Sequence, residues 1–260
     1  MIHLLNYQDK MGGGWTFSRN FIEVNGQTPY DLAEWVLVAG PTLATREDLD
    51  KCKKDGKKIA LRLDNHLLDS RNRGTGMTRM KLFSKNADLV IYQSEWAKGY
   101  LQPFTGREGP VIINGCDLEQ FVPSQEKNDY LYVRSSRINE KGWEMAKHWF
   151  SINGEGLLNI AGKFSADNLP NFDFFMGERF KFWGEQSHVT VATLMSTSKY
   201  FLYSYFMDAC SNTLIEARAA GCEIIDVYGM LGTGGAPEIM ACKDLSRERM
   251  VKQYLEVLNG

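Results

Sequence analysis

Two carboxylates stand eight residues apart in the segment "DACSNTLIE", which begins at Asp208 and ends at Glu216. An apolar run at 199–205 predicts a strand before them, and an Ala-rich stretch at 212–221 predicts a helix that begins between them. We expect Glu216 in the first turn of that helix, where its carboxylate could accept both hydroxyls of a ribose. The amides at 211–214 could bind phosphate oxygens. Asp208 could bind the hydroxyls of a second sugar. Carboxylates near helix starts are also common as caps, so the two acids alone fit a structural role too.

Two cations lie before another predicted helix. Arg137 and Lys141 fall between a predicted strand at 129–136 and a predicted helix at 141–152. Arginine binds phosphate as a planar fork and lysine as a point charge, so the pair suits a diphosphate. A solvated Arg and Lys is the alternative when the segment is taken alone.

Three consecutive glycines, Gly12, Gly13 and Gly14, follow the first predicted strand and open the first predicted helix. Glycine lets backbone amides approach an anion closely, and a helix N-terminus favours negative charge. The pattern is not GxGxxG, so it does not indicate a dinucleotide-binding fingerprint. A simple tight turn is the alternative.

The elements that must position these groups are short apolar runs that alternate with amphipathic stretches. This alternation predicts βαβ units and mostly parallel sheets. It breaks at 114–129, which holds a turn, a proline and a polar cluster, and then restarts. We therefore predict an α/β fold with two doubly wound, Rossmann-like domains that face a cleft, with ligands at the carboxyl ends of the strands. The predicted boundaries are 1–123 for the first domain, 124–245 for the second, and 246–260 for a C-terminal helix that could pack back on the first.

The predicted strands cover 2–7, 34–40, 58–63, 88–94, 110–115, 129–136, 157–164, 173–177, 181–184, 199–205 and 222–228. The predicted helices cover 14–24, 45–56, 77–87, 94–104, 141–152, 187–198, 212–221 and 246–258.

Composition narrows the class of protein. The 260 residues carry a formal net charge of -2, so only a local patch could contact a nucleic acid or a membrane surface. The five cysteines are scattered along the sequence and form no CxxC pair. Such a distribution is typical of a protein in the reducing cytosol, and it does not indicate a metal site. No apolar run reaches the ~18 residues of a membrane span, and the N-terminus lacks the features of a signal peptide. We expect a cytoplasmic protein.

The segment "DACSNTLIEARAAGCEII" resembles the carboxylate-x7-carboxylate element of retaining GT-B glycosyltransferases of sequence family 4. The resemblance extends over nearly the whole chain. "MGGGWTFSRNF" is similar to the Gly-rich loop of the family's acceptor domain, and "VIINGCDLEQFVP" to its interdomain linker. "SSRINEKGWEMA" is similar to the segment that binds the donor phosphates, and "GGAPEIM" to the stretch after the last strand.

The resemblance implies roles by position. Glu216 would bind the donor ribose, and Asp208 the transferred sugar. Arg137 and Lys141 would neutralise the leaving diphosphate without a metal ion. The remaining donor contacts would be Gly13, Gly14, Asn212, Thr213 and Leu214. The donor would be a nucleotide sugar, a UDP-sugar by frequency in the family, and no other cofactor is implied.

His66 falls at the family's His/acid segment and would contact the sugar near the reaction centre. In this chain "LDNH" reverses the usual order of the histidine and the acid. A satisfied polar side chain at a strand end is the alternative for His66. Arg137 and Lys141 are also four residues apart, one fewer than the family spacing.

The acceptor is indicated by one basic segment, 71–85, which contains no acid. It could follow DNA phosphates, bind anionic lipid headgroups or be an ordinary solvated face. Compact members of the family resemble phage-encoded enzymes that glycosylate hydroxymethylated pyrimidines in DNA, which would place this protein in a host cytoplasm. The target base would have to be flipped out of the duplex. The candidate acceptor contacts are Asp64, Arg71, Arg73 and Arg79, and Trp15, Phe17 and Trp96 are candidates either for base stacking or for core packing.

A nucleotide-sugar epimerase or a phosphorylase would share the predicted two-domain architecture, and a product assay would identify an epimerase because it moves no sugar to an acceptor. Two further functions fit the same residues. One is a glycosyltransferase of surface polysaccharide or lipid-linked glycan synthesis. The other is a catalytically inactive module that binds a sugar nucleotide. The first differs only in its acceptor, whereas the second would bind a donor without turning it over.

Overall fold

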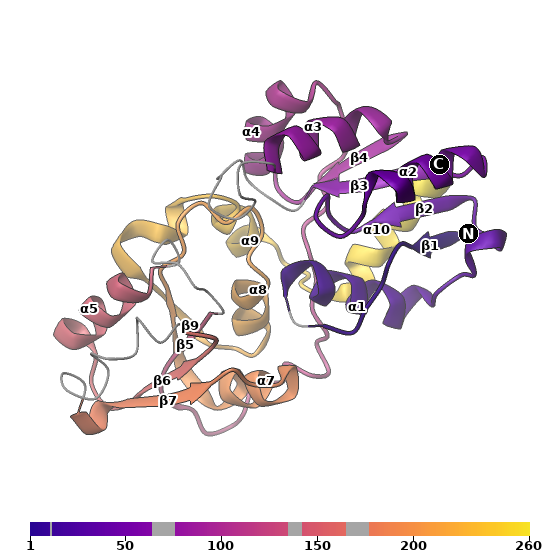
Figure 1. Ribbon diagram of the computed structural model, residues 1–260. Helices are drawn as coiled ribbons and strands as arrows, with labels where there is room; N and C mark the ends of the chain where they lie inside the picture. The colour runs from indigo at the N-terminus through magenta and orange to yellow at the C-terminus, as the bar shows by residue number, and fades with distance from the viewer. Residues whose placement is uncertain (11, 64–75, 135–141, 165–176) are drawn as a thin grey trace. The chain divides into compact units, whose positions relative to one another are not determined.

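The computed structural model covers residues 1–260 and describes 1–10, 12–63, 76–134, 142–164 and 177–260 (Figure 1). The chain forms two compact units. The first comprises residues 1–115 and 238–260, and the second comprises 116–237. The division therefore follows Gly115 rather than residue 123, and the chain returns to the first unit at Glu238 rather than at residue 246.

The first unit contains a parallel sheet with strand order β1-β2-β3-β4. Side chains alternate along each strand, so neighbouring residues pack on opposite faces. Val36 and Val38 of β2 join a core cluster that also contains residues of α2, α3 and α4. Leu37, between them, joins a second cluster with residues of α1 and α10. The strands of this unit are β1 (Ile2–Leu4), β2 (Trp35–Val38), β3 (Lys58–Leu63) and β4 (Leu89–Tyr92), and its helices are α1 (Gly13–Asn25), η1 (Tyr30–Leu32), α2 (Arg46–Lys54), α3 (Gly76–Asn86), α4 (Glu95–Thr105) and α10 (Arg247–Asn259).

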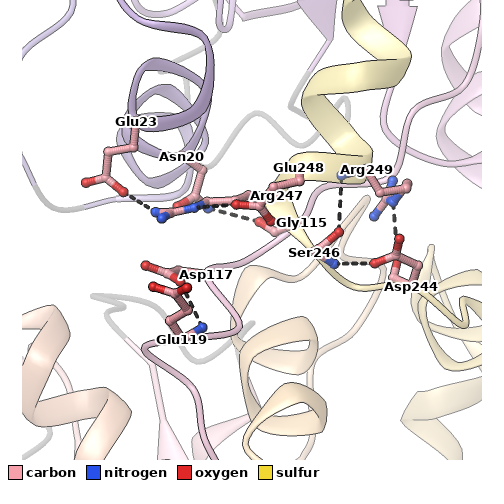
Figure 2. A network of polar contacts seen from close by, with 10 residues as sticks. All are labelled: Asn20, Glu23, Gly115, Asp117, Glu119, Asp244, Ser246, Arg247, Glu248 and Arg249. Atoms are coloured by element: carbon pink, nitrogen blue, oxygen red, sulfur yellow. Dashed lines mark hydrogen bonds and ion pairs between the residues drawn. The ribbon is translucent and has the colours of Figure 1, made fainter.

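The last helix, α10, packs beside α1 in this unit. The Tyr254 ring lies 5.3 Å from the Phe17 ring and 5.8 Å from the Phe21 ring, and all three side chains are buried. Figure 2 shows the polar contacts where α10 begins. Ser246 caps the helix by accepting from the Arg249 amide at 3.1 Å, and Arg247 pairs with Glu23 of α1.

Close packing explains the glycine of the linker sequence "NG", Gly115. A Cβ atom at Gly115 would lie 2.2 Å from the Ser246 carbonyl oxygen, so only glycine fits beside the start of α10. The Gly115 carbonyl oxygen also accepts from the Asn20 side-chain amide at 2.9 Å.

The strand predicted at 110–115 is wrong. Only Val111 forms an isolated bridge, to Tyr92. Pro110 has no N–H to donate to a ladder, and the carbonyl oxygens of Ile113 and Asn114 accept from the Arg249 guanidinium at 2.7 and 2.8 Å. A side chain of α10 therefore satisfies the backbone that a strand would have paired.

The second unit contains a five-stranded parallel sheet with strand order β7-β6-β5-β8-β9. In this order β6 and β7 follow β5 on one side of the sheet, and β8 and β9 lie on the other side of β5. A strand order that reverses direction in this way is doubly wound. The strands are β5 (Asn128–Val133), β6 (Leu158–Ala161), β7 (Phe180–Gly184), β8 (Ser198–Tyr203) and β9 (Glu223–Asp226). The helices are α5 (Trp143–Asn153), η5 (Gly177–Arg179), α7 (His188–Thr197), α8 (Asn212–Ala219) and η6 (Val227–Gly232), and α9 (Ala236–Ala241) follows at the boundary with the first unit. The predicted strand at 173–177 lies outside the described residues except for Gly177, which begins η5.

Candidate functional site

The sheet of the second unit has a topological switch point between its neighbouring strands β5 and β8. In open parallel α/β sheets, ligands bind outside the carboxyl ends of the strands at such a point. Arg134 follows β5 directly, and the loop 204–211 follows β8. The acidic segment identified in the sequence therefore lies where this fold places a ligand.

Asp208 forms a part-buried ion pair at this switch point. Its Oδ2 atom accepts from Arg134 Nη2 at 2.8 Å, and the two side chains are 19% and 10% exposed. Its Oδ1 atom accepts from the Cys210 amide at 3.2 Å. Both carboxylate oxygens are thus held by protein donors.

The Arg134 guanidinium rests on an aromatic face. It lies 3.9 Å from the centroid of the Tyr205 ring, whose hydroxyl donates to the Val133 carbonyl oxygen. Burial is the largest single effect on the pKa of Arg134 and lowers it, but the charge and hydrogen bond of Asp208, together with Tyr205 and Tyr132, raise the pKa overall, so the group is a permanent cation. Burial raises the pKa of Tyr205 to about 12, which keeps its hydroxyl protonated. The strand ends therefore form a rigid support under Asp208.

The backbone of Asp208 is held from the other side by the loop before α9. The Gly235 amide donates to the Asp208 carbonyl oxygen at 2.9 Å. Gly234 has φ +59°, and a Cβ atom there would lie 2.4 Å from the same oxygen. The glycines of the "GGAPEIM" segment thus allow the close approach that fixes the Asp208 loop.

Helix α8 begins at Asn212 because Ser211 caps it, with the Ser211 Oγ atom accepting from the Leu214 amide at 3.4 Å. Asn212, Thr213 and Leu214 form its first turn, whose N–H groups lack acceptors within the helix. The first turn contains no acidic residue, so the expected first-turn place of Glu216 is wrong. Glu216 is the fifth helical residue, and its side chain is 5% exposed.

His188 contacts this buried carboxylate. Its Nε2 atom lies 3.1 Å from Glu216 Oε1, so the tautomer that donates carries its proton on Nε2. His188 is the first residue of α7, which Ser187 caps. The Phe121 ring packs edge-on against the imidazole at 5.3 Å. The phenylalanine of the linker motif therefore supports the side chain that holds Glu216.

Close backbone contact also explains Gly142, at the N-cap of α5. It has φ +74°, and a Cβ atom there would lie 1.9 Å from the Ser204 carbonyl oxygen at the end of β8. Arg137 and Lys141, the cations predicted just before it, lie outside the described residues.

In the first unit, Gly13 and Gly14 are the first two residues of α1, after an N-cap at Gly12 with φ 131°. Arg79 is engaged by its own chain, because its Nη2 atom donates to the Ala44 carbonyl oxygen at 2.8 Å. Phe17 is 1% exposed and packs on Tyr254, so it is a core residue rather than a stacking surface. Asp64, His66, Arg71 and Arg73 lie outside the described residues.

Two residues of the site were missed by the sequence analysis, Arg134 and His188. A sequence feature could have pointed to each residue. Arg134 follows the last apolar residue of a predicted strand, and His188 follows a serine at a predicted helix start. Both signals are weak, because a strand end and a helix start do not reveal which distant side chain lies opposite.

Among the described residues, no group of three or more His, Cys, Asp and Glu side chains could hold a metal ion. No helix in that part of the chain has the length and apolar character to cross a membrane.

The fold has clear relatives among solved structures, although no protein-family model and no curated protein matches the sequence. The chain is similar to HepE from Anabaena in complex with UDP, with a TM-score of 0.74, 14% identity and 99% coverage of both chains. It is similar to AviGT4, a glycosyltransferase involved in avilamycin A biosynthesis, with a TM-score of 0.68, 12% identity and coverage of 99% and 96%. For sucrose-phosphate synthase from Thermosynechococcus elongatus the TM-score is 0.67, with 14% identity and coverage of 93% and 75%. At these identities the likeness establishes the fold, and the chain has the two Rossmann-like α/β units of the GT-B glycosyltransferases.

Proposed function

We propose that the chain is a metal-independent, retaining glycosyltransferase that moves a sugar from a nucleotide diphosphate sugar, a UDP-sugar by preference, to an acceptor hydroxyl. One observation carries the proposal. Asp208 and Glu216 flank the start of α8 at the switch point of the second sheet, in a fold shared with a protein that was solved in complex with UDP. A carboxylate on each side of a helix start suits a ligand with a phosphate between two sugars.

The proposed roles follow from this arrangement. Glu216 accepts from the ribose hydroxyls, the amides of the first turn of α8 bind phosphate oxygens, and Asp208 accepts from hydroxyls of the transferred sugar. The side chains of Arg137 and Lys141, together with the start of α1 at Gly13 and Gly14, neutralise the leaving diphosphate. His66 contacts the transferred sugar near the reaction centre.

The bond changes of the proposed transfer balance without a further reactant. The bond between the sugar's anomeric carbon and the diphosphate oxygen breaks, and a bond to the acceptor oxygen forms on the same face. The departing diphosphate takes the proton of the acceptor hydroxyl. Stabilisation of charge on the leaving group and alignment of the acceptor supply the rate enhancement.

The proposed acceptor is a 5-hydroxymethylpyrimidine in phage DNA, and the basic segment 71–85 supports it. Lys81 and Lys85 of that segment are exposed on α3, where they could contact phosphates. Arg79 contributes less than its charge suggests, because it already donates to Ala44. Asp64, Arg71 and Arg73 complete the proposed acceptor contacts.

A donor-and-acceptor screen by mass spectrometry tests the proposal. The protein is incubated with UDP- and GDP-sugars and with duplex DNA that contains or lacks 5-hydroxymethylcytosine. A mass gain of one sugar on the modified base supports both donor and acceptor. Slow hydrolysis of one nucleotide sugar without transfer to DNA supports the donor alone and favours a surface polysaccharide or lipid-linked glycan as acceptor. Binding of a nucleotide sugar without turnover of any donor indicates an inactive binding module and contradicts the enzyme.

A further inference from the structure

The Glu216 carboxylate is an unusual group to bury, because a desolvated charge is costly unless it is paired. Its side chain is 5% exposed on the second turn of α8. Among the described residues, its recorded side-chain partner is His188, which bonds to Oε1. The hydrogen bond from the His188 imidazole therefore compensates for the water that the carboxylate loses on burial, and it also orients the carboxylate.

His188 is itself fixed by its surroundings. It begins α7, where the Ser187 Oγ atom accepts from the Thr190 amide at 3.1 Å and sets the first turn. The Phe121 ring restricts the imidazole from its edge, and Phe121 is 1% exposed. A side chain held by a helix cap and by a buried ring loses little further freedom when it bonds to Glu216.

We infer that His188 is a positioning residue that makes this protein selective for a ribonucleotide, because it fixes the Glu216 carboxylate for the vicinal 2′ and 3′ hydroxyls of a ribose. The inference rests on the proposed function. Two adjacent hydroxyls can both donate to one carboxylate only when its plane faces them. The bond from Nε2 to Oε1 sets that plane, and each oxygen keeps a lone pair for a hydroxyl.

The role is distinct from general support of the helix. A histidine that served only to stabilise α7 and α8 would affect all ligands of the site equally. A histidine that orients Glu216 affects only ligands that carry the ribose hydroxyls, and a side chain with a donor at the place of Nε2 should restore the effect.

Titration calorimetry with UDP and with 2′,3′-dideoxy-UDP tests the inference on the full chain. The wild type should bind UDP more tightly than the dideoxy analogue. His188→Leu should lower UDP affinity by about 10-fold, since a hydrogen bond to a charged group is at stake, and should leave affinity for the analogue unchanged. His188→Gln, whose amide nitrogen can take the place of Nε2, should restore most of the preference. His148→Gln is the matched control, because His148 lies on α5 and contacts Tyr228 of η6 rather than Glu216.

The outcomes separate this inference from the proposed function. Unchanged preference for UDP in His188→Leu would overturn the positioning role while leaving the donor site intact. An equal loss of affinity for both ligands would overturn it as well, because it indicates general damage to the fold. Absence of UDP binding in the wild type would overturn the proposed function and the inference together.

Discussion

The Arg134 guanidinium lies 2.8 Å from the Asp208 carboxylate, although the two residues are 74 positions apart in the chain. The contact joins the residue after β5 to the loop that follows the neighbouring strand β8, at the switch point of the second sheet. It gives the carboxylate that we assign to the transferred sugar a fixed position and a permanent counter-charge.

Removal of Arg134 should destabilise the second unit. Arg134→Met removes the guanidinium that lies 2.8 Å from the part-buried Asp208 carboxylate, and breaking an ion pair that is largely shielded from solvent costs about 3 kcal/mol. Urea unfolding of the variant should show this loss in the free energy of unfolding. The double variant Arg134→Met, Asp208→Asn should recover part of the stability, because the two changes remove both charges of the pair. Equal stability of the wild type and Arg134→Met would contradict the ion pair.

Gly234 should tolerate no side chain. Gly234→Ala places a Cβ atom 2.4 Å from the Asp208 carbonyl oxygen at φ +59°, so the Asp208 loop must shift. We expect sugar transfer to fall at least about 10-fold, because a displacement of about 1 Å at a positioning group can cost 10²-fold. Gly232→Ala is the control, since a Cβ atom there meets nothing within 4 Å. Similar turnover rates for the two variants would argue against a fixed Asp208 loop.

Variants at the proposed donor site and at the proposed acceptor site should have different effects on binding. Glu216→Ala removes the carboxylate assigned to the ribose and should abolish binding of a nucleotide sugar. Arg71→Ala combined with Arg73→Ala should spare donor binding and weaken only a polyanionic acceptor, with a reduced salt dependence. Calorimetry with the donor and gel-shift titration with modified DNA at several salt concentrations measure the two effects. Full turnover by Glu216→Ala would show that the donor site is assigned wrongly.

Much of the fold was predictable from local pattern. Strand β3 runs over 58–63 as predicted, because its apolar run is bounded by the charged stretch of α2 and its side chains are buried up to the end. Helix α8 begins at Asn212 as predicted, since Ser211 is a strong N-cap. These features depend on neighbours in sequence, which a single chain displays directly.

The details that failed depend on distant residues. An apolar run at 110–115 has the composition of a strand, but Arg249 takes its carbonyl oxygens. The pairing of Arg134 with Asp208 and of His188 with Glu216 requires the strand order of the sheet, which local pattern does not give. Contacts across a sheet depend on its strand order. The two acids, Asp208 and Glu216, could therefore be identified from the sequence, but the residues that pair with them could not.

The free energy of unfolding at acidic pH should depend on Asp48, which takes part in the cap at the start of α2. Burial is the largest single effect on the pKa of this carboxylate and raises it, but the hydrogen bonds from the Thr45 backbone amide and the Asn6 side-chain amide, together with the Thr45 side chain, lower the pKa overall. A carboxylate with a lowered folded pKa contributes stability above its unfolded pKa of about 4, and loses it as the pH falls through the folded value. Asp48→Asn should therefore be less stable than the wild type at pH 6, by about 1 kcal/mol for a weakened cap, and the difference should shrink as the pH falls below the unfolded pKa of Asp48.

Asp50→Asn is the control for this prediction. Asp50 lies on the same helix but pairs at 3.7 Å with Arg46 on an exposed face and takes no part in the cap. Unfolding free energies measured between pH 3 and pH 7 compare the variants. A stability difference for Asp48→Asn that is constant over this range would contradict the lowered pKa.

Whether a nucleotide diphosphate binds at the start of α8 can be measured by backbone amide NMR of the full chain during titration with UDP. The largest shift changes are expected at the amides of Asn212, Thr213 and Leu214, and these changes should be lost in Glu216→Ala. UDP binding that shifts amides elsewhere in the chain and leaves these three unchanged would contradict a donor site at α8.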